Sequence, residues 1–373
     1  MALNQVGLER LNTATTKKIG TNKNLIINGA MEVAQRGTSS TTSGYGSVDR
    51  FHIQYNAGTR THSQTAITSG SPYENGFRNV LRITNTTVGG GAGSSGITNA
   101  FQYLEAQDVA NSGWNYTSSS SFVTLSFWVR SSVAQEFYGY LRTFDGTEQA
   151  YCFSTGSLSA NTWTKITKTI PGNSNITINN DNGTGLQVNI SPFWGGDFTT
   201  SGKTTDSWAA FSGANRTPDY ATTWAGTASA TFDITGVQLE VGRVATDFEH
   251  RSISDELLRC YRYFQILSSN TSGGLNAHSR YPLFGNGTNS AIWYAYHKAT
   301  MRVKPSLVKS GITTSTMDIY NYSASGTATF NNMVMAEGDE NHSQMVCTTT
   351  GAISTAQIVS WRWSTNADCY IYP

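Results

Sequence analysis

Between residues 24 and about 248, short stretches of alternating apolar and polar residues follow one another, separated by Gly, Asn and Ser turns. The strongest stretch is SFVTLSFWVRSS (121–132), which is dense in β-branched and aromatic residues. Almost no helical period lies between the stretches, and alternation with a period of two is typical of half-buried strands. The pattern therefore predicts an all-β domain, an N-terminal jelly-roll β-sandwich over 24–250. The predicted strands are 48–55, 79–87, 121–132, 136–144, 162–170, 185–194 and 229–242, with a further short strand opening the domain at 24–27.

The pattern changes at RSISDELLRCYRYFQIL (251–267). Ser252 followed by Asp255 resembles a capping box. Leu257, Tyr261 and Phe264 then recur at helical spacing. We expect a helix of about 12 residues within 252–266, and we assign residues 251–268 as a connecting α-helix.

Strand patterns return after this helix, so residues 269–373 are expected to form a small C-terminal β-sandwich, the tip domain. At the other end, the apolar residues of 1–18 form an imperfect helical stripe. This stripe fits either a frayed terminus or a short helix that docks on another protein. We assign residues 1–23 as an attachment segment.

The chain is only 13% charged, carries a formal charge of +1, and contains 12% aromatic residues and 36 glycines. Disordered chains are usually poor in aromatic residues and strongly charged, so this composition favours folded, turn-rich β structure. A nearly neutral chain gives no reason to expect a nucleic-acid partner. No apolar run is long enough for a membrane helix, and the N-terminus lacks the apolar core of a signal peptide. We expect synthesis in a cytoplasm without export by the usual route.

Catalytic motifs are absent from the sequence. The six histidines are scattered, and no nucleophile elbow, phosphate-binding loop or dinucleotide fingerprint occurs. We therefore expect that the protein is not an enzyme. A pair of carboxylates brought together by the fold stays open as an alternative. The four cysteines are expected to be buried free thiols, although a Cys347–Cys369 disulfide is possible.

Aromatic residues in polar surroundings suggest a binding role. Sugar rings stack on flat aromatic faces while nearby amides and hydroxyls pair with sugar hydroxyl groups; the same composition also suits protein-binding surfaces or rings that pin loops to the domain. The candidate glycan-binding residues are Trp208 and Trp224 in the jelly roll, and Trp293, Tyr294, Tyr296, Trp361 and Trp363 in the tip domain. For the tip residues, burial in an oligomer core is an equal alternative.

Four stretches carry a resemblance: NLIINGAMEVAQRGTS, VDRF, LSFWVRSS, and the closing run from QLEVG through ATDFEHRS to ELLRCYRYF. Over residues 24–265 the chain resembles a family of bacteriophage tail-fibre and receptor-binding proteins. The resemblance implies a jelly roll, a helix, a variable C-terminal β-domain, and a homotrimer carried on the virion. The first and last strands also resemble those of carbohydrate-binding modules.

In those modules, a Glu of the first strand and an Asp pair of the last strand often help to bind a structural calcium ion. Glu32 matches the Glu of the first strand, but Thr235 and Gly236 occupy the positions of the Asp pair in the last strand. Asp233 lies on that strand, two residues before those positions. Glu32 and Asp233 are therefore a weak calcium pair, and we expect no cofactor.

We interpret Asn28, Gly29, Glu32 and Arg36 instead as a structural seam between the first and last strands. Glu249, Arg251 and Asp255 are its expected partners, and Asn28-Gly29 supplies the turn.

The function expected from the sequence is that of a structural virion protein, a tail fibre or spike that attaches a phage to its host. Attachment would occur by non-catalytic binding of a neutral or lightly charged host-surface glycan, as a homotrimer. Residues 1–23 would dock on other virion proteins after synthesis in the host cytoplasm. Three alternatives are a capsid-decorating or fibre-base protein that binds only virion partners, a polysaccharide depolymerase, and a bacterial surface module. The missing signal peptide disfavours the last.

Overall fold

The computed structural model describes residues 22–270, 277–278, 283–285, 289–310, 317–321, 326–350, 358–363 and 367–372. The chain divides into two compact units. The jelly-roll unit contains 22–30, 53–60 and 66–250, and the C-terminal unit contains 31–52, 61–65 and the described residues from 251 onward. The predicted attachment segment lies outside the described residues, apart from its last two. Within the described part of the chain, no helix is long and apolar enough to cross a membrane.

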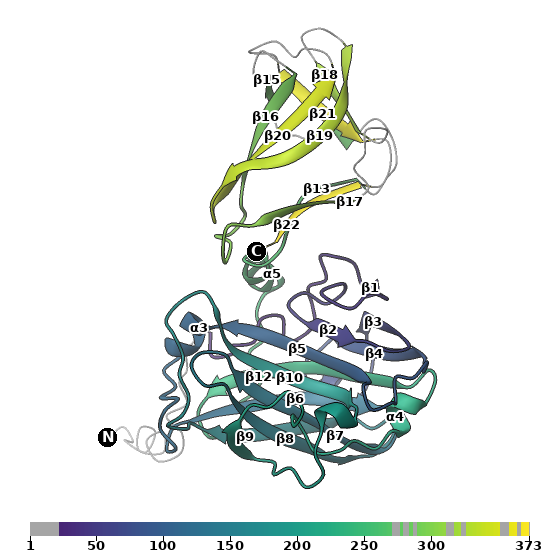
Figure 1. Ribbon diagram of the computed structural model, residues 1–373, viewed down its shortest axis with the longest axis vertical. Coiled ribbons are helices and arrows are strands. Elements are labelled where there is room, and N and C mark those ends of the chain that lie inside the picture. Colours follow the sequence, from purple (N-terminus) through teal and green to yellow (C-terminus); the bar gives the residue numbers. More distant parts are fainter. Residues whose placement is uncertain are drawn as a thin grey trace, which may run out of the picture. The chain divides into compact units, whose positions relative to one another are not determined.

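Two antiparallel sheets build the jelly-roll unit (Figure 1). In the first sheet β4, β12, β6 and β9 are consecutive neighbours, and the second sheet has the order β11-β8-β7-β10-β5-β2. The strands are β2 (His52–Tyr55), β4 (Asn79–Thr87), β5 (Ile97–Glu105), β6 (Phe122–Ser131), β7 (Gln135–Thr143), β8 (Gln149–Leu158), β9 (Thr164–Pro171), β10 (Thr184–Trp194), β11 (Ser207–Ala210) and β12 (Thr231–Val241). Short helices α2 (Ser71–Glu74), α3 (Ala106–Ala110), α4 (Thr223–Gly226) and the 3₁₀ turn η1 (Gly196–Phe198) lie between them.

The core of this unit lies between the two sheets, where alternate residues of each strand point inward. Phe127 of β6 and Phe153 of β8 have ring centroids 6.3 Å apart. Phe137 of β7 and Phe232 of β12 join the sheets in the same way at 4.9 Å. The prediction of an all-β jelly roll is confirmed.

The predicted strand at 48–55 is correct only in its second half. Strand β2 begins at His52, because Arg50 adopts a φ of +73°, which breaks the extended backbone. Two long strands, β5 and β8, were not predicted. Their segments, ITNAFQYLE and QAYCFSTGSL, mix small and polar residues with the apolar ones, so the period of two is weak.

The opening segment 24–30 runs along β12 without being a regular strand. The backbone N–H of Leu25 donates to the carbonyl of Leu239 at 2.9 Å, and that of Val237 donates to the carbonyl of Gly29 at 3.0 Å. A Cβ at position 29 would lie 2.1 Å from the Val237 oxygen, so only glycine permits this approach. Asn28 has a φ of +61°, as a turn-forming Asn can. Asn28 and Gly29 thus lie beside the last strand of the unit, β12.

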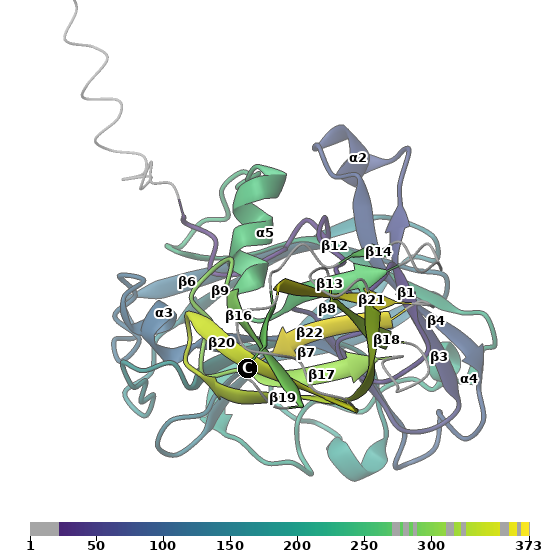
Figure 2. The same cartoon turned by 90° about the horizontal axis from the view of Figure 1, so that it is seen from above.

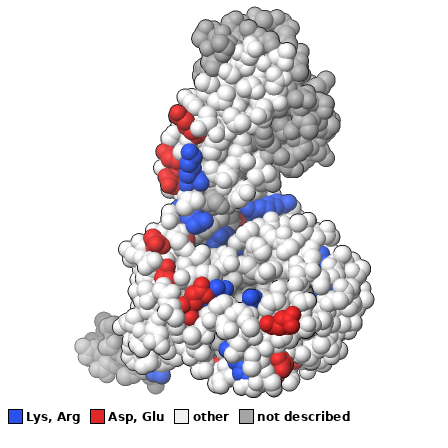
Figure 3. Space-filling view, viewed as in Figure 1, with Lys and Arg blue, Asp and Glu red and all other residues white. Residues whose placement is uncertain are grey.

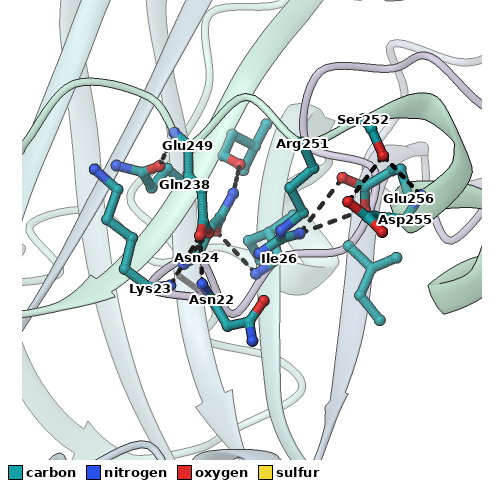
Figure 4. A network of polar contacts seen from close by, with 12 residues as sticks. Asn22, Lys23, Asn24, Ile26, Gln238, Glu249, Arg251, Ser252, Asp255 and Glu256 are labelled. Atoms are coloured by element: carbon teal, nitrogen blue, oxygen red, sulfur yellow. Dashed lines mark hydrogen bonds and ion pairs between the residues drawn. The ribbon is translucent and has the colours of Figure 1, made fainter. Parts of the chain in front are cut away.

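Glu249 completes this seam (Figure 4). Its carboxylate accepts hydrogen bonds from the backbone N–H groups of Asn22, Lys23 and Asn24. The side chain of Asn24 in turn donates to the carbonyl of Val237 at 3.1 Å. Glu249, one of the three partners expected for the seam, therefore binds the backbone at the start of the domain.

The remaining seam residues lie in the C-terminal unit, with other partners. Arg36 pairs with Asp49 at 3.9 Å, and its guanidinium carbon lies 3.5 Å from the ring centroid of Phe264. Arg251 pairs with Glu256, and the hydroxyl of Ser252 donates to Asp255 (Figure 4). Glu32 is half-buried.

Helix α5 (Ile253–Tyr261) confirms the predicted helix and its cap. The Ser252 hydroxyl accepts a hydrogen bond from the backbone N–H of Asp255, as the capping box requires. The helix ends five residues earlier than the predicted limit of 266. Phe264 and Tyr263 instead leave the helix and stack under Arg36 and Arg50, respectively.

The strands of the C-terminal unit form a three-stranded sheet, β13-β22-β17, and a larger sheet, β14-β21-β15-β16-β20-β19-β18 (Figure 2). Strand β18 also pairs with β21, so the larger sheet closes on itself. The predicted small β-domain is therefore present, with one closed sheet. Its strands are β13 (Gln265–Asn270), β14 (Ala277–His278), β15 (Leu283–Gly285), β16 (Ser290–Tyr296), β17 (Ser306–Ser310), β18 (Met317–Asn321), β19 (Gly326–Gly338), β20 (His342–Thr350), β21 (Ile358–Trp363) and β22 (Ala367–Tyr372), while β1 (Ser39–Ser40) pairs with β3 (Thr59–Ala66).

The cysteines with described side chains are Cys152, Cys260 and Cys347, and all three are buried. The possible Cys347–Cys369 disulfide involves the side chain of Cys369, which lies outside the described part of the structure.

Candidate ligand-binding face

Two of the predicted glycan-binding residues are core residues. Trp224 has no exposed surface, because its ring packs against Phe232 and its indole N–H donates to the carbonyl of Thr231 at 3.1 Å. Trp293 is also fully buried, since alternate residues of β16 point into the domain. A ring without exposed surface cannot stack on a sugar, so both residues leave the set of candidates.

Trp208 is half-buried at the edge of the second sheet. It lies opposite Tyr151 in the β11–β8 register, and the two rings meet edge to face at 5.5 Å. Its indole N–H donates to the carbonyl of Pro171, at the end of β9, at 2.7 Å. Trp208 therefore ties an edge strand of one sheet to an edge strand of the other.

The tip residues Tyr294 and Tyr296 are exposed, at 47% and 82%. They occupy positions i and i+2 of β16 and so share one face of the closed sheet. The side-chain amide of Gln344 donates to the Tyr294 hydroxyl at 2.7 Å. Trp361 and Trp363 belong to β21, but their side chains lie outside the described part of the structure.

Asp233, the weak calcium candidate, is held by two arginines. Arg82 and Arg130 lie opposite it in the registers of β4 and β6, and both guanidinium groups donate to its carboxylate at distances down to 2.7 Å. The Asp233 side chain has no exposed surface. Its oxygens already have cationic partners, so its surroundings fit an ion triad better than a calcium site. Among the described residues, no cluster of three or more His, Cys, Asp or Glu suits a metal ion.

The outer face of the second sheet carries a different set of residues from its core face. Phe137 of β7 packs against Phe232 of the first sheet, so Leu141, four residues further along β7, and its register partner Val188 also face that sheet, and their neighbours along each strand face away from it. Those neighbours are Tyr140 and Arg142 on β7, and Gln187 and Asn189 on β10. Phe101 and Tyr103 on β5 lie opposite Asn189 and Gln187 in the register and so share the same face.

Aromatic rings surround this outer face. Tyr103 meets the rings of Phe101 and Phe144 at 5.0 and 5.6 Å. The guanidinium of Arg142 stacks between Phe144 and Phe211, at 4.5 and 3.6 Å from their ring centroids. Tyr103, Phe144 and Phe211 are each half-buried, so part of each ring reaches solvent. The face thus combines partly exposed rings with polar groups.

Two amide side chains at the centre of this face have atoms without hydrogen-bond partners. Gln187 Oε1 and Asn189 Nδ2 are both buried and unpaired. Asn189 Oδ1, in contrast, accepts a hydrogen bond from the Ser191 hydroxyl. An unpaired buried amide atom costs about 1–3 kcal/mol. One acceptor and one donor, two residues apart on the same side of β10, therefore have no hydrogen-bond partner within the protein, which ordered water or a hydroxyl-bearing ligand that reaches them would supply.

The segment between β10 and β12 covers part of the face and is firmly attached to it. The hydroxyl of Tyr220 donates to the carbonyls of Tyr138 and Ser191, each at 3.1 Å. Backbone bonds join Thr200 to Thr217 and Arg216 to Phe198. Burial under this segment raises the pKa of Tyr140 to about 12, so the phenol stays neutral and can donate a hydrogen bond.

Sequence reasoning did not identify this face, although two of the three strands that carry it, β7 and β10, were predicted. The signal lies in the alternation of EFYGYLRTF and GLQVNISPFW, where polar or aromatic residues stand at every second position. Tyr140, Arg142, Gln187 and Asn189 follow this period. The face also includes Phe211 and Arg216, which belong to an irregular segment whose position is known only from the structure.

No protein-family model matches the chain, and no curated protein matches it. Solved structures show limited similarity. A family 4 carbohydrate-binding module is 10% identical with a TM-score of 0.31, over 58% of this chain and 98% of its own. A C-terminal family 22 carbohydrate-binding module from Clostridium thermocellum is 13% identical with a TM-score of 0.30, over 58% and 100%. A putative sugar-binding protein from Bacteroides thetaiotaomicron is 11% identical with a TM-score of 0.30, over 59% and 100%.

Proposed function

We propose that the protein binds glycan without catalysing a reaction, through the outer face of the second jelly-roll sheet. The observation that carries this proposal is the pair of unpaired buried amide atoms, Gln187 Oε1 and Asn189 Nδ2, in the middle of partly exposed aromatic rings. A sugar can contact both the aromatic rings and the amide groups. Its C–H faces pack on rings such as Tyr103 and Phe211, and its hydroxyl groups both donate and accept hydrogen bonds.

Tyr294 and Tyr296 form a second, smaller contact surface in the C-terminal unit under this proposal. Two exposed rings on one sheet face are suited to weak stacking contacts. Most of the described surface on the side of the molecule shown in Figure 3 is uncharged, which matches the low charge of the chain. Affinity at each site would be low and raised by multiple copies, because linked sites gain effective concentration.

We further propose that the protein is a bacteriophage tail fibre or spike that attaches the particle to host-surface glycan. The sequence resemblance over residues 24–265 supports this role, as does the capped helix that follows the jelly roll. In this proposal the chain acts as a homotrimer on the virion, and residues 1–23 dock on other virion proteins. A capsid-decorating or fibre-base protein is the alternative, and it would bind virion partners only.

Glycan binding is tested with the labelled full chain on a printed panel of bacterial and plant polysaccharides. Phe211→Ala removes a partly exposed ring from the face, and the loss of about 1.5 kcal/mol of stacking would weaken binding about tenfold. Trp163→Ala is the matched control, because Trp163 is a half-buried ring of the same unit that stacks with Arg130 on the first sheet. Absence of binding to every polysaccharide would overturn the proposal.

The virion role is tested by the mass in solution and by adsorption to bacterial cells. We expect a mass of three chains and adsorption that falls when Tyr294 and Tyr296 are both changed to Ala. A trimer that binds purified virion proteins but adsorbs to no bacterial strain would favour the capsid-decorating alternative. Release of reducing ends from a bound polysaccharide would instead favour a depolymerase.

A further inference from the structure

The two arginines on the outer face of the second sheet differ in their charge balance. Arg142 is neutralised, because its Nε and Nη2 donate to Glu148 Oε2 at 2.9 and 2.6 Å. Arg216 has no carboxylate partner among the described residues. Its Nε donates only to a carbonyl, that of Gly213, at 2.9 Å. The face therefore carries one positive charge that no described carboxylate balances.

The guanidinium of Arg216 is held in a defined position. It stacks on Trp194 at 4.2 Å and lies 5.0 Å from the ring centroid of Phe198. Stacking fixes the plane of the group and leaves its N–H edge for a ligand. Tyr140 and Arg142 are its charged or polar neighbours. Burial lowers the pKa of Arg216, and the phenol of Tyr140, which is hydrogen-bonded to it, raises that pKa only in part.

Resting on the proposed glycan-binding function, we propose that the ligand of this face is an acidic saccharide whose carboxylate pairs with Arg216. A guanidinium edge matches a carboxylate through two parallel hydrogen bonds, which a hydroxyl group cannot reproduce. Gln187 Oε1 and Asn189 Nδ2 would then pair with hydroxyl groups of the same sugar or its neighbour. This inference differs from the expectation from the sequence, which was a neutral or lightly charged glycan.

The experiment uses the full chain and pairs of saccharides that differ only in charge. The panel contains oligogalacturonate, oligomannuronate, hyaluronan fragments and sialyllactose, each beside its carboxyl-reduced neutral form. Calorimetric titration gives the dissociation constant of each. We expect at least one acidic member to bind about 10- to 100-fold more tightly than its neutral form. We also expect that advantage to shrink as salt is raised.

Arg216→Gln removes the charge and should abolish the difference between the acidic and neutral forms. Arg216→Lys keeps the charge but loses the planar edge, so it should restore only part of the difference. Arg78→Gln is the matched control, because Arg78 also stacks on an aromatic ring, Tyr73, at 4.1 Å but lies on the surface outside this face. Retained binding of the neutral form by Arg216→Gln would show that the face is still folded. If neutral binding is lost as well, the circular-dichroism spectrum and the Lys variant decide between misfolding and lost contacts.

The outcomes separate this inference from the proposed function. Equal binding of acidic and neutral forms, or acidic binding that Arg216→Gln leaves unchanged, would overturn the inference and leave glycan binding standing. Binding of no saccharide at all, acidic or neutral, would overturn both.

Discussion

The ion triad of Arg82, Asp233 and Arg130 permits a quantitative prediction for the jelly-roll unit. The fully buried Asp233 carboxylate accepts four contacts: Arg82 Nε and Nη2 at 2.7 and 3.0 Å, and Arg130 Nε and Nη2 at 3.1 and 2.7 Å. Asp233→Asn keeps the size of the side chain but replaces one accepting oxygen with a donating NH₂ group. That donor would face two guanidinium groups and have no acceptor.

Breaking a buried pair by removing one partner costs about 3–5 kcal/mol. The arginine side chains are 30% and 27% exposed and can regain some hydration, so we expect a loss near the lower limit, about 3 kcal/mol. With an m-value of about 2 kcal/mol/M, the urea midpoint of the jelly-roll unit would fall by about 1.5 M. Tryptophan fluorescence follows the transition.

A matched control is Asp206→Asn, which breaks the Lys168–Asp206 pair at 3.3 Å. Asp206 is 49% exposed, so this change should cost less than about 1 kcal/mol. If Asp233→Asn proved no more harmful than Asp206→Asn, the triad would contribute nothing beyond a surface pair, and the argument from burial would be refuted.

Three further predictions concern the seam, the helix cap and the tyrosines. Gly29→Ala would place a Cβ 2.1 Å from the Val237 oxygen and should lower the free energy of unfolding by about 2–3 kcal/mol. Gly213→Ala is the control, because the nearest atom to its new Cβ would be 3.9 Å away; it should change the free energy of unfolding by less than about 0.5 kcal/mol in the same urea assay. Ser252→Ala should destabilise the C-terminal unit by about 1 kcal/mol, while the exposed helix residue Ser254 should tolerate Ala; equal effects would contradict the cap. Burial raises the pKa of three tyrosines from 10 to about 12. Between these pH values the folded state keeps phenol protons that the unfolded state releases. The contribution of these tyrosines to stability is therefore fully present below pH 10 and is lost as the pH rises toward 12. Tyrosinate absorbance during an alkaline titration should show a late-ionising class, absent in urea, that contains Tyr138, Tyr140 and Tyr151; ionisation of every tyrosine near pH 10 would count against the burial.

The sequence predicted the strands that are richest in β-branched and aromatic residues, such as β6 and β12, because their period of two is strong. It also predicted helix α5 and its cap, since capping is a local interaction. The candidate face could not be predicted in the same way. Gln187 and Arg216 are 29 positions apart, and only the path of the segment between β10 and β12 brings Arg216 onto the sheet.

Burial explains the wrong choices among the aromatic residues. Trp224 stands in a stretch of Ala, Thr and Gly that is typical of a loop, yet it lies in the short helix α4 with its ring in the core. The composition of neighbouring residues does not reveal the direction in which a ring points. The alternation of β16 carried that information, because it placed Trp293 on the opposite face from Tyr294 and Tyr296.

The pairing of β18 with β21 determines which kind of contact copies of the larger sheet can make with one another. An open sheet ends in strands whose free N–H and C=O groups can recruit a neighbouring chain. In the ring β21-β15-β16-β20-β19-β18, each strand has a partner on both sides. Copies crowded at high local concentration would therefore meet along this ring through side chains, which sequence changes can adjust, whereas backbone ladders between copies remain open to the edge strands β13 and β17 of the smaller sheet.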